Sequence, residues 1–121
     1  RPSFVYPLFE QALPELALGF DPSHLVWQFV DLYTALRDYG HKVRHVHVKD
    51  TVIEKGQAKF VLPGEGTTDY AALLQLVRDN AYTGCVCVEV SGMVSSKKDH
   101  DPLAAAKKCH EKLKPAFKMA K

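Results

Sequence analysis

Residues 43–50, VRHVHVKD, carry the alternation that decides the fold. Side chains of a strand point alternately to its two faces, so Val46 and Val48 would form an apolar face. The opposite face would carry Val43, His45, His47 and Lys49. Because this second face becomes polar toward the C-terminal end of the strand, we expect it to look into a functional site, while the apolar face packs under helices.

Segments with strand and helix patterns alternate on both sides of this stretch. Short apolar runs predict further strands over 16–20 and 84–90, in addition to the central strand over 42–50. Apolar residues at helical spacing predict helices over 6–13, 30–40, 69–82 and 101–118. This alternation predicts an α/β fold with a parallel sheet and right-handed crossovers.

Capping residues support two of these helices. Thr68 or Asp69 is expected to cap the helix over 69–82. Asp101 is expected to cap the last helix, with Pro102 in its first turn. The side chains that we expect this last helix to bury are Leu103, Ala106 and Leu113.

Composition narrows the class of protein. The chain has 121 residues, of which 46% are hydrophobic and 25% charged, as in ordinary globular proteins. It is much shorter than the roughly 250 residues of a closed eight-stranded α/β barrel. A net charge of +2 gives no support for binding nucleic acid. The late lysines are expected on the solvent-exposed side of the last helix: Lys107, Lys108, Lys112, Lys114, Lys118 and Lys121.

Cysteine content and hydropathy bear on the cellular location. The three cysteines make an odd number, and Cys85 and Cys87 would point the same way on one strand, where they are poorly placed to bridge. We therefore expect a reduced, cytoplasmic protein. No apolar run approaches the length of a membrane span. The chain begins at Arg1 and not at a methionine, which we interpret as the sign of a fragment or a processed chain.

The polar residues at the three strand ends would lie at one edge of the sheet. In an α/β barrel, the face turned away from the helices lines the interior, and the C-terminal mouth is the active site. The residues expected there are Asp21, His45, His47, Lys49 and Glu89. His45 lies deeper in its strand than His47, so its role could be limited to orienting other groups.

Four motifs now point to a known family: FDPSH (20–24), HVHVKD (45–50), PGEGTTDY (63–70) and VEVSG (88–92). In this order and spacing, they resemble the second half of the xylose isomerase-like TIM barrels of the AP endonuclease 2 superfamily. The similarity is greatest to the sugar phosphate isomerase/epimerase group, with its tagatose-type ketose 3-epimerases and inosose dehydratases. It extends from about Leu8 to Phe117. It implies a partial (β/α)8 TIM barrel, strands six to eight with their helices, so that residues 1–121 are the C-terminal portion of the barrel domain.

The resemblance also implies a divalent metal at the barrel mouth, held by two glutamates, one aspartate and one histidine. Asp21, His47 and Glu89 match three of these ligands, and His24 matches a catalytic residue that binds the substrate near the metal. The second glutamate belongs on the strand before Asp21, which this sequence does not contain. Carboxylates with one imidazole favour Mn²⁺, Mg²⁺ or Co²⁺, with Zn²⁺ also compatible.

The function that this family implies is a metal-dependent sugar or sugar-phosphate isomerase or epimerase. A proton next to a carbonyl group is removed through a metal-bound enediolate, with Glu89 as one of the two acid/base groups. An inosose dehydratase-like lyase shares this first step and remains an alternative. Ketose epimerases also carry an arginine after the histidine strand, and here Val52 and Ile53 stand near that place.

Two further residues are candidates for binding the substrate. Lys49 could anchor it as a cation, or equally form a salt bridge with Asp50 or with a neighbouring strand. Glu65 lies in the long connection 51–69, within which 59–62 is compatible with extended structure, and loops of this length usually serve a function. The stronger interpretation of this loop, however, is that its glycines only shape the turn before a helix.

Other classes of function compete with the enzyme interpretation. Endonuclease IV-like repair enzymes need further histidines after the histidine strand, and residues 51–68 contain none. A metal finger from Cys85, Cys87 and a histidine fails on spacing. The serious rival is a non-catalytic fragment or remnant that self-associates, and the isolated chain is expected to be inactive. The expected partners are a small polyhydroxy carbonyl substrate and either the remainder of the barrel or a second copy, with no nucleic acid and no membrane.

Overall fold

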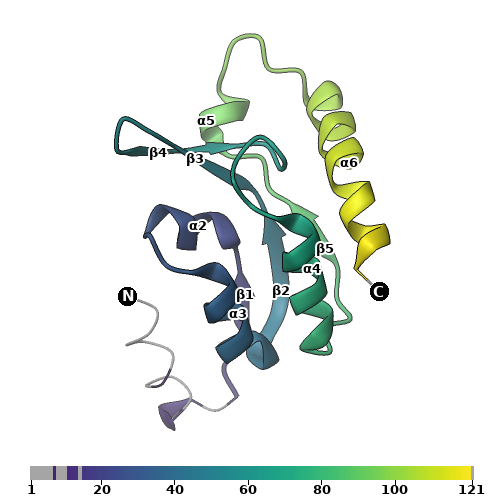
Figure 1. Cartoon of the computed structure of the whole chain (residues 1–121). Coiled ribbons are helices and arrows are strands. Elements are labelled where there is room, and N and C mark those ends of the chain that lie inside the picture. Colours follow the sequence, from purple (N-terminus) through teal and green to yellow (C-terminus); the bar gives the residue numbers. More distant parts are fainter. Residues whose placement is uncertain (1–6, 8–10, 14, 121) are drawn as a thin grey trace.

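A computed structural model describes residues 7, 11–13 and 15–120 of the chain (Figure 1). Its main sheet has three parallel strands, β1 (Leu18–Phe20), β2 (Val43–Val48) and β5 (Val86–Val88), with β2 in the middle. The predicted parallel α/β architecture is therefore confirmed. The described strands form an open sheet and do not close into a barrel. Of the helix expected over 6–13, residues 6 and 8–10 lie outside the described residues, and residues 7, 11 and 12 are helical.

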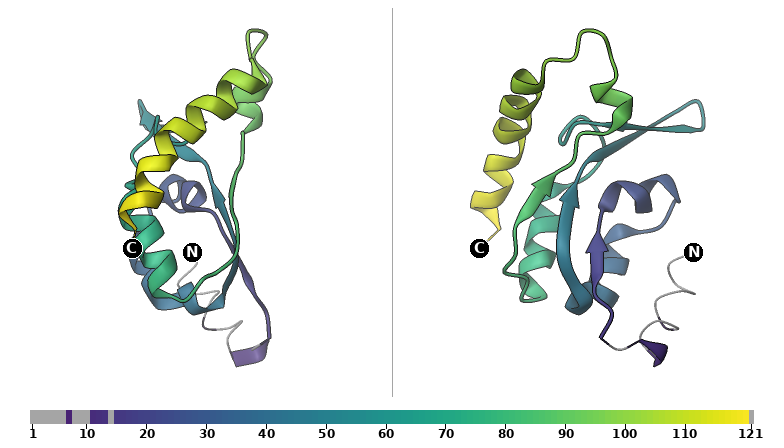
Figure 2. Two further views of the ribbon diagram at one scale, coloured as in Figure 1. Left: turned by 90° about the vertical axis from the view of Figure 1, so that its right-hand side faces the viewer. Right: turned by 180° about the vertical axis from the view of Figure 1, so that it is seen from behind.

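Helices cover one face of this sheet. They are α3 (Leu32–Tyr39), α4 (Tyr70–Asp79) and α6 (Pro102–Met119), and the side view in Figure 2 shows them on the same side of the strands. The core between sheet and helices is closely packed around Leu36, Val46 and Leu73, which are at most 1% exposed. The other face of the sheet is left uncovered by the described helices (Figure 2).

Each long helix begins at an aspartate whose carboxylate accepts hydrogen bonds from the first backbone N–H groups. Asp31, Asp69 and Asp101 cap α3, α4 and α6 in this way. Asp69 and Asp101 had been expected. A fourth aspartate, Asp21, caps α2 (Pro22–Trp27), a helix that the sequence reading missed although Pro22 follows the cap directly.

The long connection expected over 51–69 is only partly a loop. Residues 50–61 form an antiparallel hairpin of β3 (Asp50–Glu54) and β4 (Gln57–Val61), which crosses the C-terminal end of the main sheet. Its two turn residues, Lys55 and Gly56, have φ angles of 50° and 76°, as the turn of a two-residue hairpin requires. The extended segment expected over 59–62 overlaps β4, but the hairpin as a whole was missed because Lys-Gly was not read as a turn between two alternating strands.

Two details of packing also differ from expectation. Val43 lies in the core with Val46 and Val48, and not on the polar face, because the pairing of β1 with β2 shifts between Leu18 and Gly19. Helix α6 buries Ala105, Cys109, Leu113 and Ala116. Of the three side chains expected to be buried there, only Leu113 is, while Leu103 and Ala106 are exposed, one step around the helix.

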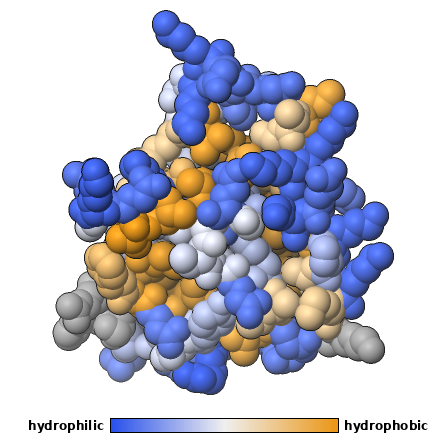
Figure 3. Space-filling view, turned by 45° about the horizontal axis from the view of Figure 1, so that its top comes forward, coloured by the Kyte–Doolittle hydropathy of each residue, from blue (hydrophilic) through white to orange (hydrophobic). Residues whose placement is uncertain are grey.

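The side of β5 away from β2 is incompletely covered. Val86, Val88 and Val90 were expected to pack under a helix, but Val88 is 42% exposed. The three valines line a groove of about 510 Å³ whose other wall is α6, with Leu113 and Phe117. Viewed toward the C-terminal end of the strands, hydrophobic surface shows between groups of hydrophilic side chains (Figure 3).

Two short helical segments complete the described chain, η1 (Gly40–Lys42) before β2 and α5 (Gly92–Ser95) after β5. Among the helices described, none combines the length and the apolar character needed to cross a membrane.

Candidate metal centre

The three parallel strands deliver one potential metal ligand each to the same edge of the sheet. Asp21 directly follows β1, His47 lies near the end of β2, and Glu89 directly follows β5. The Glu89 N–H donates to the carbonyl of Val48 at 3.0 Å, which extends the pairing of β2 with β5 and fixes the position of Glu89. One ligand atom from each of the three side chains lies within 4.8 Å of the others. This spacing is compatible with a single ion bound between them.

The carboxylate of Asp21 is held by the start of α2. Its Oδ1 accepts hydrogen bonds from the N–H and the hydroxyl of Ser23, at 2.9 and 2.6 Å. Its Oδ2 is buried and accepts no hydrogen bond of good geometry from the described residues. A buried carboxylate oxygen of this kind is costly unless a cation lies against it. The arrangement therefore leaves Oδ2 available to a cation at the centre of the cluster.

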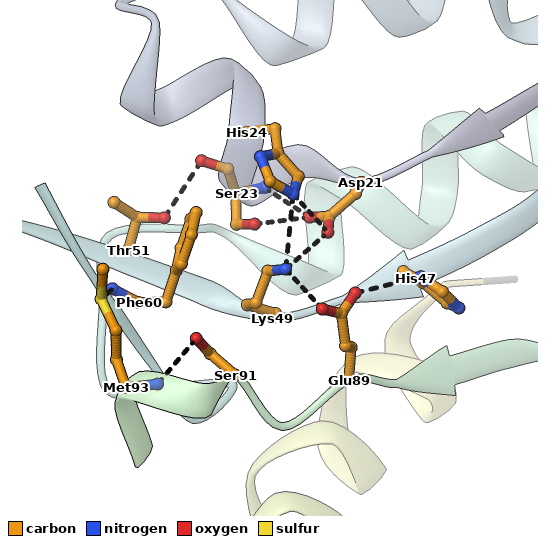
Figure 4. A network of polar contacts seen from close by, with 10 residues as sticks. All are labelled: Asp21, Ser23, His24, His47, Lys49, Thr51, Phe60, Glu89, Ser91 and Met93. Atoms are coloured by element: carbon orange, nitrogen blue, oxygen red, sulfur yellow. Dashed lines mark hydrogen bonds and ion pairs between the residues drawn. The ribbon is translucent and has the colours of Figure 1, made fainter. Parts of the chain in front are cut away.

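Lys49 supplies a cation of the chain itself. Its side chain is only 3% exposed, and its Nζ lies 2.8 Å from Glu89 Oε1 and 3.2 Å from Asp21 Oδ2 (Figure 4). Burial disfavours the charged ammonium, but the hydrogen bond to Glu89 and the charge of Asp21 outweigh it and raise the pKa of Lys49. Of the two salt bridges that the sequence left open for Lys49, the structure contains the one with neighbouring strands, to Asp21 and Glu89 at their ends.

Glu89 also contacts His47. Its Oε2 lies 3.2 Å from His47 Nδ1, and both side chains are about 40% exposed. The hydrogen bond from Lys49 is the main cause that lowers the pKa of Glu89, which favours the carboxylate form. The rings of His45 and His47 meet edge to face with their centroids 4.5 Å apart, so His45 contacts the candidate ligand His47 and is placed one step farther from the cluster.

An aromatic wall borders the cluster on the side of the hairpin. His24 is about half exposed, with Nε2 3.4 Å from Lys49 Nζ and 3.6 Å from Asp21 Oδ2. The Phe60 ring on β4 lies 5.2 Å from the His24 ring, 4.6 Å from the Trp27 ring and 4.6 Å from Lys49 Nζ. Trp27 and Phe60 were missed from the sequence. The alternation of β4 would have been the signal for Phe60, had the hairpin been recognised.

Glu65 is not brought to this cluster. Its carboxylate accepts a hydrogen bond from the N–H of Leu62 at 3.1 Å and forms an ion pair with Lys108 of α6. This ion pair is the main cause that lowers the pKa of Glu65. The described contacts of Glu65 therefore tie the loop to α6.

Asp50 is an unexpected organiser of the same loop. Its side chain is fully buried and accepts five hydrogen bonds. They come from the backbone N–H groups of Thr51, Gly64, Gly66 and Thr68 and from the Thr68 hydroxyl. A Cβ atom on Gly66 would lie only 2.3 Å from Asp50 Oδ1, so the close approach requires glycine.

The model of one known protein family matches most of the chain. The family model described as "Xylose isomerase-like TIM barrel" matches residues 9–115. The chain belongs to this family. The xylose isomerase-like TIM barrel proteins are typically metal-dependent, and Asp21, His47 and Glu89 form a possible metal site in this chain.

Several curated proteins are similar to the chain. An inosose dehydratase of Clostridium perfringens is 32% identical over 87 residues, which are 60% of this chain and 29% of the relative. An inosose dehydratase of Clostridium tetani is 29% identical over 98 residues, 68% of this chain and 33% of the relative. The uncharacterised protein YfiH of Bacillus subtilis is 39% identical over 55 residues, 46% of this chain and 18% of the relative. The chain thus spans a third or less of the length of these relatives.

Proposed function

We propose that Asp21, His47 and Glu89 hold a divalent metal in an enzyme that removes a proton next to a carbonyl group of a small polyhydroxy compound. The observation that carries this proposal is the convergence of three ligand atoms from three strand ends, with the buried Asp21 Oδ2 paired with the Lys49 ammonium and not held by a hydrogen bond of good geometry from the described residues. The donor set of two carboxylates and one imidazole favours Mn²⁺, Mg²⁺ or Co²⁺, with Zn²⁺ also compatible.

The bound metal would polarise the substrate carbonyl and stabilise the negative charge that develops when the proton leaves. Among the residues of this chain, Glu89 is the candidate acid/base group. Its pKa is lowered, chiefly by the hydrogen bond from Lys49, so Glu89 is in the carboxylate form that a general base requires, while the same hydrogen bond weakens its basicity. His24, half exposed at the rim of the cluster, would bind a hydroxyl group of the substrate. Lys49 adds a positive charge beside both.

Isomerisation, epimerisation and dehydration all begin with this proton transfer, and the first two remain the leading candidates. Dehydration is the second candidate, because the relatives from two Clostridium species are inosose dehydratases. In that case the substrate would be an inosose or a similar cyclic polyhydroxy ketone, and the abstracted proton would be followed by loss of a hydroxyl group as water.

Deuterium transfer from the solvent tests the proposal. We expect the natural protein, loaded with Mn²⁺ in D₂O, to replace the hydrogen next to the carbonyl of a polyhydroxy ketone, with inosose and common ketoses as the first substrates. Mass spectrometry separates the candidate outcomes, because a dehydratase product has lost water whereas an isomer or epimer has not. Metal-loaded protein that leaves all of these compounds unlabelled and unchanged would contradict the proposed chemistry.

We also propose that the uncovered parts of the described sheet bind further strands, either from the remainder of a barrel or from a second copy of the chain. β1 and β5 are the outer strands of the described sheet, and each has an edge without a described partner. Cys85 and His45 are exposed on the face away from the helices, and Val88 is exposed in the groove beside α6.

The isolated 121-residue segment is therefore expected to associate, since open strand edges and apolar surface both favour association. Light scattering and size-exclusion chromatography on the purified segment measure this directly, and dimers or larger species are the expected result. A monodisperse species of 13.5 kDa that unfolds cooperatively would contradict the expectation.

A further inference from the structure

The ammonium of Lys49 lies where a metal ion would be expected to bind. It contacts the carboxylates of two of the three candidate ligands, Glu89 at 2.8 Å and Asp21 at 3.2 Å (Figure 4). Because its side chain is 3% exposed, water weakens these contacts less than it weakens the exposed pair of Lys59 and Glu54 on the hairpin, although the Glu89 side chain is itself 40% exposed.

The competition between Lys49 and a metal concerns one atom in particular. Asp21 Oδ1 is engaged by both hydrogen bonds from Ser23, so only Oδ2 is open to a cation. Lys49 Nζ lies 3.2 Å from this same Oδ2. Both oxygens of Glu89 are engaged as well, Oε1 by Lys49 and Oε2 by His47. A metal ion that takes Asp21 Oδ2 as a ligand must therefore displace the ammonium from it.

The surroundings of Lys49 stabilise the ammonium in this position. The Phe60 ring lies 4.6 Å from Nζ, a cation–π distance, and the backbone N–H of Phe60 donates to the sulfur of Met93. His24 Nε2 lies 3.4 Å from Nζ on the side of α2. The ammonium thus has partners from the hairpin and from α2 besides the two carboxylates.

We propose that Lys49 is a resident cation of the metal centre: it keeps Asp21 and Glu89 paired in the metal-free protein and yields Asp21 Oδ2 when a divalent metal binds. Lys49 is then a positioning residue that sets the metal affinity of the site. The inference concerns the regulation of the proposed metal centre and rests on that proposed function.

Thermodynamic coupling determines whether loss of the Lys49 ammonium raises or lowers the metal affinity. If Lys49 and the metal compete, removal of the ammonium leaves two carboxylates close together and unpaired in the metal-free protein, which destabilises that state. The metal-bound state loses less, because the metal itself neutralises the carboxylates. Competition of this kind must act equally in both directions, so a variant without the ammonium binds the metal more tightly.

Lys49→Met in the natural protein tests this prediction, because methionine keeps the length of the side chain without the charge. Titration calorimetry with Mn²⁺ on metal-stripped protein is expected to give a dissociation constant about 10- to 100-fold lower than that of the wild type. The melting temperature of the metal-free variant should fall, and the rise that Mn²⁺ causes should exceed that of the wild type. Lys59→Met, which removes an exposed lysine from the hairpin, should change neither quantity.

A second measurement uses the wild-type protein, should Lys49→Met fail to fold. Reductive methylation followed by mass spectrometry measures how accessible each lysine is. Lys49 should be protected in the metal-free protein and react faster when Mn²⁺ is added, relative to Lys59.

The inference is overturned if Lys49→Met binds Mn²⁺ as the wild type does or more weakly, or if Mn²⁺ leaves the labelling of Lys49 unchanged. If neither the wild type nor the variant binds Mn²⁺, the proposed metal centre itself is wrong, and the inference falls with it. The two failures are distinguishable by the wild type. If the wild type binds Mn²⁺, only the inference about Lys49 can fail; if the wild type does not bind Mn²⁺, the metal centre itself has failed.

Discussion

In the natural protein, Glu89→Gln is expected to lower the rate of deuterium incorporation by about 10²- to 10⁴-fold, the usual contribution of a general acid/base group. Glutamine has nearly the same shape, but its amide cannot accept the proton that leaves the substrate. It is also a poorer metal ligand, and it removes the charge that Lys49 contacts at 2.8 Å. The measurement is proton exchange in D₂O by nuclear magnetic resonance, with the bound Mn²⁺ quantified on the same samples.

Glu54→Gln is the matched control for this variant. Glu54 is 57% exposed at the hairpin, and its side chain pairs with Lys59 among the residues that the structure describes. The same substitution there should leave the rate and the metal content unchanged. His47→Gln should reduce the metal content, whereas His45→Gln, which removes a ring that contacts His47 but is not one of the three candidate ligands, should be milder. A Glu89→Gln variant with wild-type exchange would remove Glu89 from the chemistry.

The largest expected effect on stability is at Asp50. We expect Asp50→Asn to lower the free energy of unfolding by about 3 kcal/mol, because its charged carboxylate is replaced by a neutral amide whose NH₂ group faces N–H donors. All five hydrogen bonds to Asp50 come from donors, and the side chain is fully buried, so neither rotation of the amide nor water can satisfy the lost acceptor. Urea unfolding of the natural protein, followed by circular dichroism, measures the change.

Asp69→Asn provides the control for Asp50→Asn. Asp69 is exposed, and its side chain accepts one hydrogen bond from the described residues, from the N–H of Ala72 at the start of α4. Asparagine caps helices about as well as aspartate, so this variant should change the free energy of unfolding by only a few tenths of a kcal/mol. If the two variants were equally stable, Asp50 would not organise the loop as its contacts indicate.

The parts of the fold that were predicted from the sequence depend on local signals. The three strands end close to Asp21, His47 and Glu89, as predicted, because alternation and short apolar runs indicate strands of a covered sheet directly. The convergence of the three side chains followed from one rule, that parallel strands have their carboxyl ends at one edge. Their roles as ligands remain predictions until metal binding is measured.

The parts that were missed depend on relationships between distant residues. The role of Asp50 was not predictable, because four of its five hydrogen bonds come from residues 14 to 18 positions away in the loop. For Lys49, a salt bridge with a neighbouring strand was one of the open alternatives, but its two partners lie at the ends of two other strands and could not be named from the sequence. The face of Val43 was misassigned because a shift in strand pairing has no signature in the strand itself. Similarly, Leu103 was expected in the core from helical periodicity alone, and periodicity does not show whether another element packs against that side of the helix.

Lys49 and Asp50 are consecutive residues with opposite charges, and their side chains have different partners: Lys49 contacts the metal centre and Asp50 the loop. Insertions or deletions within β2 should therefore be poorly tolerated. A single codon deleted there would draw Asp50 toward the place of the ammonium, where it would meet Asp21 and Glu89 as a third carboxylate. The hairpin turn at Lys55 and Gly56 is exposed and free of such constraints, so length variation among natural versions of this protein should gather at that turn and be absent from residues 43–50.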